Sequence, residues 1–349
     1  MSSSTSNSDI ASPRRLSRRW LTGFVCILAL LTLGGMAFNT WFSTRPKLVE
    51  DLQELQLTCF KIFSPERYDM VASGSSRINF GIDPESMQPY LPGIRIHNCA
   101  MFGGSINHEI LEYLEQRKID WDSPRQRIVL LEITPRIMWE DLRKNGSYRS
   151  ILNKPPDEIR RLMTYSPDKR FSFHNFFMPM DRERWNMRQK RKSVTRPHCH
   201  VDTGWYEVEN LAITPEMNEA GVLKQLSKAD VMRAHRKRYS IDRSLSEILE
   251  RTRAWSAKGV LVFGVEPPID PRIKALEEEL SGYDAKRVHA LFLEAGGIMI
   301  PVSGQYRVVL GGSHLDSREA KHFSAEIAQR IAEEFARRAA QGNASAEKP

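Results

Sequence analysis

The chain has 349 residues, of which 41% are hydrophobic and 27% charged, and this balance excludes a wholly disordered protein. A mean hydropathy of −0.45 excludes a polytopic membrane protein, and four cysteines are too few for a scaffold built from disulfides. The formal net charge of +8 permits an anionic partner, but it does not choose among nucleic acid, acidic glycan and lipid headgroups.

The N-terminal region has the pattern of a membrane anchor. A serine-rich tail and four arginines precede an uncharged, largely apolar run from Trp20 to Thr44. A helix of about 20 such residues crosses the ~30 Å hydrocarbon layer of a bilayer. Because the arginines lie on its N-terminal side, the positive-inside rule predicts a cytoplasmic tail at 1–19 and a transmembrane signal-anchor at 20–42. The alternative is a cleaved signal peptide with Gly35-Met36-Ala37 as the cleavage site.

Both alternatives export the bulk of the chain. In a bacterium, the anchor predicts a single-pass protein of the inner membrane whose main domain lies in the periplasm. Residues 43–65 keep apolar side chains at helical spacing and predict a stalk or linker helix, whereas residues 339–349 predict a disordered tail.

Strand and helix patterns alternate between these ends, at 66–338. Short apolar runs typical of buried strands occur at Tyr68–Ala72, Ile94–His97, Arg127–Ile133, Gly259–Val265 and Gly297–Val302. Helical spacing occurs at Gly104–Arg117, Asp284–Ala295 and Ser317–Arg338. The alternation predicts an α/β fold, a flavodoxin-like three-layer sandwich around a central parallel sheet. The stretch 134–226 has no clean period and predicts an insertion over the sheet.

Three short segments fall at the ends of predicted strands, where parallel sheets bind their ligands. The first, Gly74-Ser75-Ser76-Arg77, puts Ser76 on a tight turn into a helix, where backbone N–H groups stabilise a developing anion. The second offers the Gly103 N–H and the Asn98 side chain to an oxyanion. The third, Gly312 to Asp316, puts His314 where it can take the serine proton. These segments predict Ser76 as a nucleophile and His314 as its general base.

The order of these segments resembles the SGNH (GDSL-like) hydrolase superfamily. The resemblance implies that Ser76 is the nucleophile, that Ser76 and Gly103 contribute oxyanion donors and that His314 is the base. The chain looks especially like the membrane-anchored SGNH-type proteins of envelope and exopolysaccharide acylation, such as the alginate O-acetyltransferase and teichoic-acid D-alanylation families. An N-terminal anchor before an exported domain fits that subgroup.

Two positions depart from that family. It usually carries an aspartate two or three residues before the histidine, but Gly311 and Gly312 stand there in this chain. The usual asparagine after the central strand is also absent, and is part of the reason for considering Asn98. The aspartate holds the imidazole in the right tautomer, and losing that role costs ~10⁴ in rate. We expect a backbone carbonyl, Glu132 or Asp316 to orient His314, with a helix cap as the alternative role of Asp316.

Other candidate sites are weaker. His198, His200 and Asp202 share one face if the chain is extended there, but no further ligand pair lies nearby, so we predict no metal and no cofactor. The basic run from Arg182 to Arg196 predicts either a solvated face or a surface for an anionic glycan or lipid. The exported compartment and the lack of a binding motif argue against nucleic acid.

The function predicted from the sequence is acyl-ester chemistry on a cell-envelope or secreted polysaccharide. Water as the acceptor gives an esterase, and a sugar hydroxyl gives an O-acyltransferase. A transferase of this kind implies, by resemblance, a polytopic membrane acyltransferase as a partner. The alternative is an inactive SGNH-like scaffold that binds polysaccharide or assembles an envelope complex, because the aspartate is missing.

Overall fold

The computed structural model describes residues 18–43, 46–103, 106–140, 146–164, 195–210 and 213–346. The chain divides into two units, 1–49 and 50–349. In the first unit, Arg18–Ser43 forms helix α1. Among the described residues, no helix has the length and apolar character needed to cross a bilayer. The anchor at 20–42 therefore stays a prediction from the sequence, and the tail before residue 18 lies outside the described residues.

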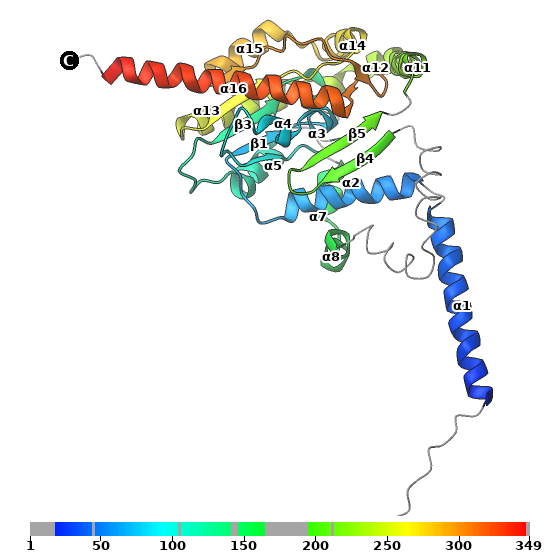
Figure 1. Ribbon diagram of the computed structural model, residues 1–349. Helices are drawn as coiled ribbons and strands as arrows, with labels where there is room; N and C mark the ends of the chain where they lie inside the picture. Colours follow the sequence, from blue (N-terminus) through cyan, green and yellow to red (C-terminus); the bar gives the residue numbers. More distant parts are fainter. Residues whose placement is uncertain are drawn as a thin grey trace, which may run out of the picture. The chain divides into compact units, whose positions relative to one another are not determined.

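The second unit is built on a parallel sheet of five strands, as the alternating pattern predicts (Figure 1). The strands, in their order across the sheet, are β2 (Ile96–Asn98), β1 (Met70–Ser73), β3 (Ile128–Glu132), β6 (Leu261–Val265) and β7 (Gly297–Met299). In this doubly wound order, the direction of winding reverses between β1 and β3. A ligand crevice is expected outside the carboxyl ends of these two strands.

Helices flank the sheet, so successive residues of each strand enter two different cores. Val71, Val129 and Val262 belong to one core and Ala72 and Leu130 to the other. Because both faces are covered, the strands are continuous apolar runs and not alternating ones.

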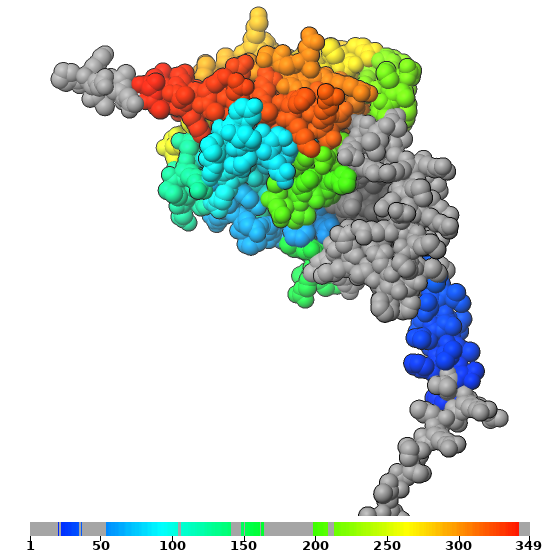
Figure 2. All heavy atoms as spheres, in the orientation of Figure 1, coloured from blue at the N-terminus to red at the C-terminus, as the bar shows by residue number. Residues whose placement is uncertain are grey.

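The helices that complete the first core include α2 (Pro46–Phe63), α13 (Asp242–Ala257) and α15 (Ala285–Glu294). The second is completed by α3 (Ser76–Gly81), α4 (Pro84–Met87) and α16 (Ser317–Ala346). Figure 2 shows α16 in red against the cyan segment around α4. This helix runs to Ala346, past the point at which the sequence predicts a disordered tail.

The region after β3 contains regular structure that the sequence pattern does not reveal. Its described helices are α6 (Pro135–Met138), α7 (Gly146–Leu152), α8 (Pro156–Thr164) and α11 (Pro215–Leu226). A hairpin of β4 (Thr195–His200) and β5 (Trp205–Asn210) packs on α3, and the Trp205 indole N–H donates to Phe80 O at 2.9 Å. Most of the basic run, 182–194, lies outside the described residues.

The predicted helix at Gly104–Arg117 is shorter than expected. Helix α5 covers His108–Tyr113 and passes into a π-helical turn, η1 (Leu114–Lys118). Helix α12 (Ala229–Ala234) and the 3₁₀ turn η3 (Arg236–Tyr239) precede β6, and α14 (Pro271–Ser281) follows it. Two short strands, β8 (Val308–Val309) and β9 (His314–Leu315), pair before α16.

Candidate active site

The turn between β1 and α3 presents Ser76 at the carboxyl edge of the sheet. Gly74 leaves no room for a side chain, because a Cβ there would lie 2.7 Å from Glu132 Oε2 and 2.6 Å from Ile78 Cγ1. Ser75 then caps the helix, since its hydroxyl accepts from Arg77 N at 3.2 Å. Ser76 is therefore the first residue of α3, where its own N–H has no intrahelical acceptor.

The loop before His314 is pressed against α11 and the start of α14. Gly311 and Gly312 have φ values of +71° and +75°, in the left-handed region that favours glycine. A Cβ on Gly312 would lie 2.7 Å from Val222 Cγ2 and 2.7 Å from Asp270 Cβ. Gln225 Nε2 donates to Gly311 O at 2.7 Å. The position where the SGNH resemblance implies an aspartate therefore has no space for one.

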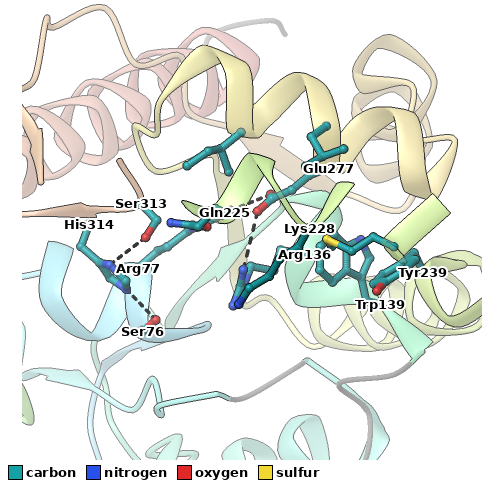
Figure 3. A pocket seen from close by; sticks show the side chains of 13 residues that line it. Ser76, Arg77, Arg136, Trp139, Gln225, Lys228, Tyr239, Glu277, Ser313 and His314 are labelled. Atoms are coloured by element: carbon teal, nitrogen blue, oxygen red, sulfur yellow. Dashed lines mark hydrogen bonds and ion pairs between the residues drawn. The ribbon is translucent and has the colours of Figure 1, made fainter. Parts of the chain in front are cut away.

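Ser76 and His314 meet, although 238 positions separate them in the chain. Ser76 Oγ lies 2.8 Å from His314 Nε2, in the geometry of a nucleophile and its base (Figure 3). On the other side of the ring, His314 Nδ1 lies 3.0 Å from Ser313 Oγ, which is 3.4 Å from Leu310 O. Ser313 can accept from Nδ1–H while it donates to the Leu310 carbonyl. These partners assign the proton to Nδ1 and leave the Nε2 lone pair facing Ser76.

Ser313 is the residue that reasoning from the sequence missed. Its hydroxyl occupies the place of the orienting group, for which the sequence predicts a backbone carbonyl, Glu132 or Asp316. The only signal in the sequence is its position next to the histidine. A neighbouring serine is common, so that signal is weak without the loop geometry.

Neither expected carboxylate orients His314. Glu132 is fully buried, and its Oε2 accepts from both N and Oγ of Ser75 at 2.7 Å, while its Oε1 accepts from Thr134 Oγ1 at 2.7 Å. Asp316 Oδ1 accepts from Glu319 N at 2.9 Å at the start of α16. Glu132 therefore fixes the turn that carries the nucleophile, and Asp316 has the capping role.

The side-chain amide of Asn98 is hydrogen-bonded to backbone groups, so the prediction of Asn98 as an oxyanion donor is wrong. Its side chain is fully buried, and Nδ2 donates to Ile78 O at 2.9 Å and to Ile82 O at 2.8 Å. Its Oδ1 accepts from Ala100 N at 3.0 Å. Gly103 has a φ of +56° and is not among the residues that line the cavity described next.

A cavity of about 490 Å³ opens over Ser76 and His314 (Figure 3). Its walls combine polar, cationic and aromatic side chains from seven elements and their loops. They are Ser76, Arg77, Arg136, Trp139, Gln225, Lys228, Met232, Tyr239, Ile273, Leu276, Glu277, Ser313 and His314.

The cavity carries more positive than negative charge. Arg77 and Glu277 form a bidentate ion pair, in which Arg77 Nη1 lies 3.0 Å from Glu277 Oε2. Their side chains are only 2% and 3% exposed. Arg136 and Lys228 add two more cations to the walls. Burial of the ring, helped by the charges of Arg77 and Arg136, lowers the pKa of His314 to about 3. The imidazole is therefore neutral at pH 7, as a proton acceptor must be.

The weaker candidates stay apart from this site. His200 Nε2 pairs with Glu207 Oε2 at 2.9 Å within the β4–β5 hairpin. Among the described residues, no cluster of three or more His, Cys, Asp or Glu side chains is placed to hold a metal ion. Cys59 and Cys99 are buried free thiols, and burial raises the pKa of each to about 11.

Comparisons with protein-family models, with curated proteins and with solved structures found no match to this chain. Its function is therefore inferred from the geometry around Ser76 and His314.

Proposed function

We propose that the chain is an SGNH-like serine enzyme that cleaves or transfers acyl esters. The observation that carries this proposal is the 2.8 Å contact between Ser76 Oγ and His314 Nε2. Two further features support it. The contact lies at the carboxyl edge of β1, beside the point where the winding of the sheet reverses. Serine after the first strand and histidine before the last helix also match the order of the superfamily.

The chemistry proceeds in two steps. Ser76 Oγ attacks the carbonyl carbon of an ester, its proton passes to His314 Nε2, and the carbonyl electron pair moves onto oxygen. Collapse of this tetrahedral adduct expels the alkoxide, which takes the proton from His314 and leaves an acyl group on Ser76. Water or a sugar hydroxyl then attacks the acyl-enzyme by the same route in reverse.

The proposed catalyst is slow by the standard of Ser-His-Asp enzymes. His314 must become an imidazolium in the transition state, but Ser313 offers Nδ1 a neutral hydroxyl in place of a carboxylate. Neutralising the triad aspartate costs ~10⁴ in rate where that has been the only change. A pKa of about 3 expresses the same weakness, because the protonated ring is poorly stabilised.

We further propose that the substrate is an envelope or secreted polysaccharide, reached from a membrane anchor at 20–42. The uncharged run in the sequence supports the anchor. Trp139 and Tyr239 line the cavity beside polar side chains, and this mixture suits a sugar ring with apolar faces and hydroxyl edges. A polytopic acyltransferase that supplies the acyl group belongs to the transferase form of the proposal.

Labelling by a fluorophosphonate, which modifies activated serines, tests the proposal on the full-length protein in detergent. We expect wild type to be labelled and Ser76→Ala and His314→Ala to be unlabelled. Ser227→Ala and His322→Ala are matched controls, because both side chains are exposed outside the cavity. Absence of labelling in folded wild type refutes the proposed enzymatic activity and favours the inactive scaffold. Labelling that survives Ser76→Ala identifies another nucleophile.

A further inference from the structure

The proposed reaction needs a second donor for its oxyanion. Acyl transfer is accelerated chiefly by donors aimed at the oxygen on which negative charge develops. The N–H of Ser76, at the start of α3, supplies one. Asn98 supplies none, because its amide already donates to Ile78 O and Ile82 O. Gly103 does not line the cavity.

Arg136 is placed to supply the missing donor. It follows β3 as the second residue of α6, so it rises from the strand next to the one that carries Ser76. Its side chain lines the same cavity as Ser76 and His314 and is 43% exposed. Figure 3 shows it between the serine–histidine pair and the aromatic side chains.

Among the described residues, no group forms a hydrogen bond with the Arg136 guanidinium, so its N–H groups are available to a ligand. Its Nη1 lies 4.0 Å from Glu277 Oε1, which is too far for a hydrogen bond, whereas Arg77 engages both oxygens of that carboxylate. Its Cζ also lies 5.8 Å from the centroid of the Trp139 ring, a contact that uses no N–H group. The fork of a guanidinium presents several N–H groups in one plane and suits an anionic oxygen.

The positive charge of Arg136 already reaches the reacting pair. It is one of the two charges that lower the pKa of His314, whose Nε2 is 2.8 Å from Ser76 Oγ. Lys228 lines the cavity as well, but its charge is not one of those two.

Resting on the proposed function, we propose that Arg136 donates an N–H to the oxyanion formed when Ser76 attacks an ester. The carbonyl electron pair moves onto oxygen as the Ser76–carbon bond forms, and the Ser76 N–H and the Arg136 guanidinium bind that oxygen. When the adduct collapses, the pair returns to the carbonyl and both donors are released. This makes Arg136 a catalytic residue and Glu277 the group that keeps Arg77 from competing for the same position.

The test uses the full-length protein in detergent and a neutral ester, p-nitrophenyl acetate. Arg136→Gln is expected to lower kcat by 10²–10³-fold, the loss typical of one oxyanion donor, with KM changed less than threefold. Arg136→Lys is expected to recover part of that loss, because it keeps the charge but not the fork. Lys224→Gln is the matched control, since it removes one positive charge from an exposed position of α11 outside the cavity, and we expect a change below threefold.

The alternative role for Arg136 is to bind a negative group of the substrate. In that case Arg136→Gln raises KM for an ester that carries a carboxylate and leaves kcat for the neutral ester unchanged, which overturns the inference. Thermal unfolding of each variant separates loss of folding from loss of chemistry. If wild type is neither active nor labelled at Ser76, the proposed function fails along with the inference. If wild type is labelled and Arg136→Gln is as active as wild type, only the inference fails.

Discussion

Ser313→Ala tests how much His314 depends on the hydroxyl beside it. The substitution removes the acceptor that lies 3.0 Å from Nδ1 and the donor that lies 3.4 Å from Leu310 O. The second contact is at the limit of a hydrogen bond, so we count only the first. A neutral hydrogen bond contributes about 0.5–1.5 kcal/mol net, which corresponds to roughly 2–13-fold in a rate. We therefore expect a loss of that size, far smaller than the ~10⁴ for a triad aspartate.

The second-order rate constant for fluorophosphonate labelling of the full-length protein measures this loss. Ser227→Ala, at an exposed serine that ends α11, provides the control for a lost hydroxyl. A loss above 10³-fold, with the thermal unfolding midpoint unchanged, would refute the reasoning, because a neutral hydrogen bond cannot contribute so much. An unchanged rate would show that the ring is held by its packing, including the ring of Phe80 at 4.7 Å, and not by Ser313.

Ser313→Asp makes the opposite change at the same position. A carboxylate facing Nδ1 stabilises the imidazolium, so the pKa of His314 should rise from about 3 and the labelling rate should increase. The pKa is measured by NMR titration of the ring. A raised pKa without a faster rate would mean that base strength does not limit the reaction.

Three further predictions concern pH and stability. The pKa of His314 is depressed in the folded state, so the free energy of unfolding should be highest above about pH 6.5 and should fall as the pH drops toward 3. In urea unfolding, His314→Gln should show a smaller pH dependence between these two values. Gly312→Ala should destabilise the fold by about 2–5 kcal/mol, because the added Cβ collides with its neighbours and the backbone is strained at positive φ. Gly282→Ala, also at positive φ but with open space around it, should destabilise by only about 1–2 kcal/mol. Equal losses in the two variants would contradict the predicted collision at Gly312. Glu277→Gln should cost about 3–5 kcal/mol in urea unfolding because it leaves a buried arginine unpaired, against about 0–1 kcal/mol for Glu279→Gln in an exposed pair.

The fold could be predicted where burial leaves a pattern in the sequence. The strand at Ile128–Glu132 reads as a continuous apolar run because helices cover both of its faces. The β4–β5 hairpin could not be predicted in the same way. Its strands contain Pro197, His198 and Glu207, so apolar and polar residues do not alternate cleanly. What holds it is tertiary contact, such as the close approach of Gly204 to Asn98 O, where a Cβ would lie only 2.2 Å away.

Some residues of the candidate site could likewise be predicted from the sequence, and others could not. Ser76 and His314 could be predicted because turns at strand ends bring such residues to one edge of a parallel sheet. The sequence predicts Asn98 as an oxyanion donor because its amide follows a strand and the asparagine usual after the central strand is absent. In the fold, the C-terminal end of α3 presents carbonyls to it, and the amide satisfies them. Pairing of this kind depends on neighbours that are distant in the chain, so local sequence does not reveal it.

The positive charge of Arg136 should stabilise the oxyanion and destabilise the protonated form of His314. In the tetrahedral adduct, the oxyanion is negative and His314 is positive, so a cation nearby stabilises the first and destabilises the second. Arg136 gives a net benefit only if it lies closer to the oxyanion than to Nε2. Arg136→Gln should therefore raise the pKa of His314 above about 3 while it lowers kcat.

These two changes have opposite effects on catalysis, and their combination is diagnostic. A variant that only loosened the site would let water reach His314, raising the pKa and lowering kcat, but it would also increase KM and lower the unfolding midpoint. NMR titration of the His314 ring, steady-state kinetics on p-nitrophenyl acetate and thermal unfolding of the same variant distinguish the two cases. A fall in kcat with the pKa of His314 unchanged would mean that the charge of Arg136 does not reach the reacting pair, and a different donor would then have to bind the oxyanion.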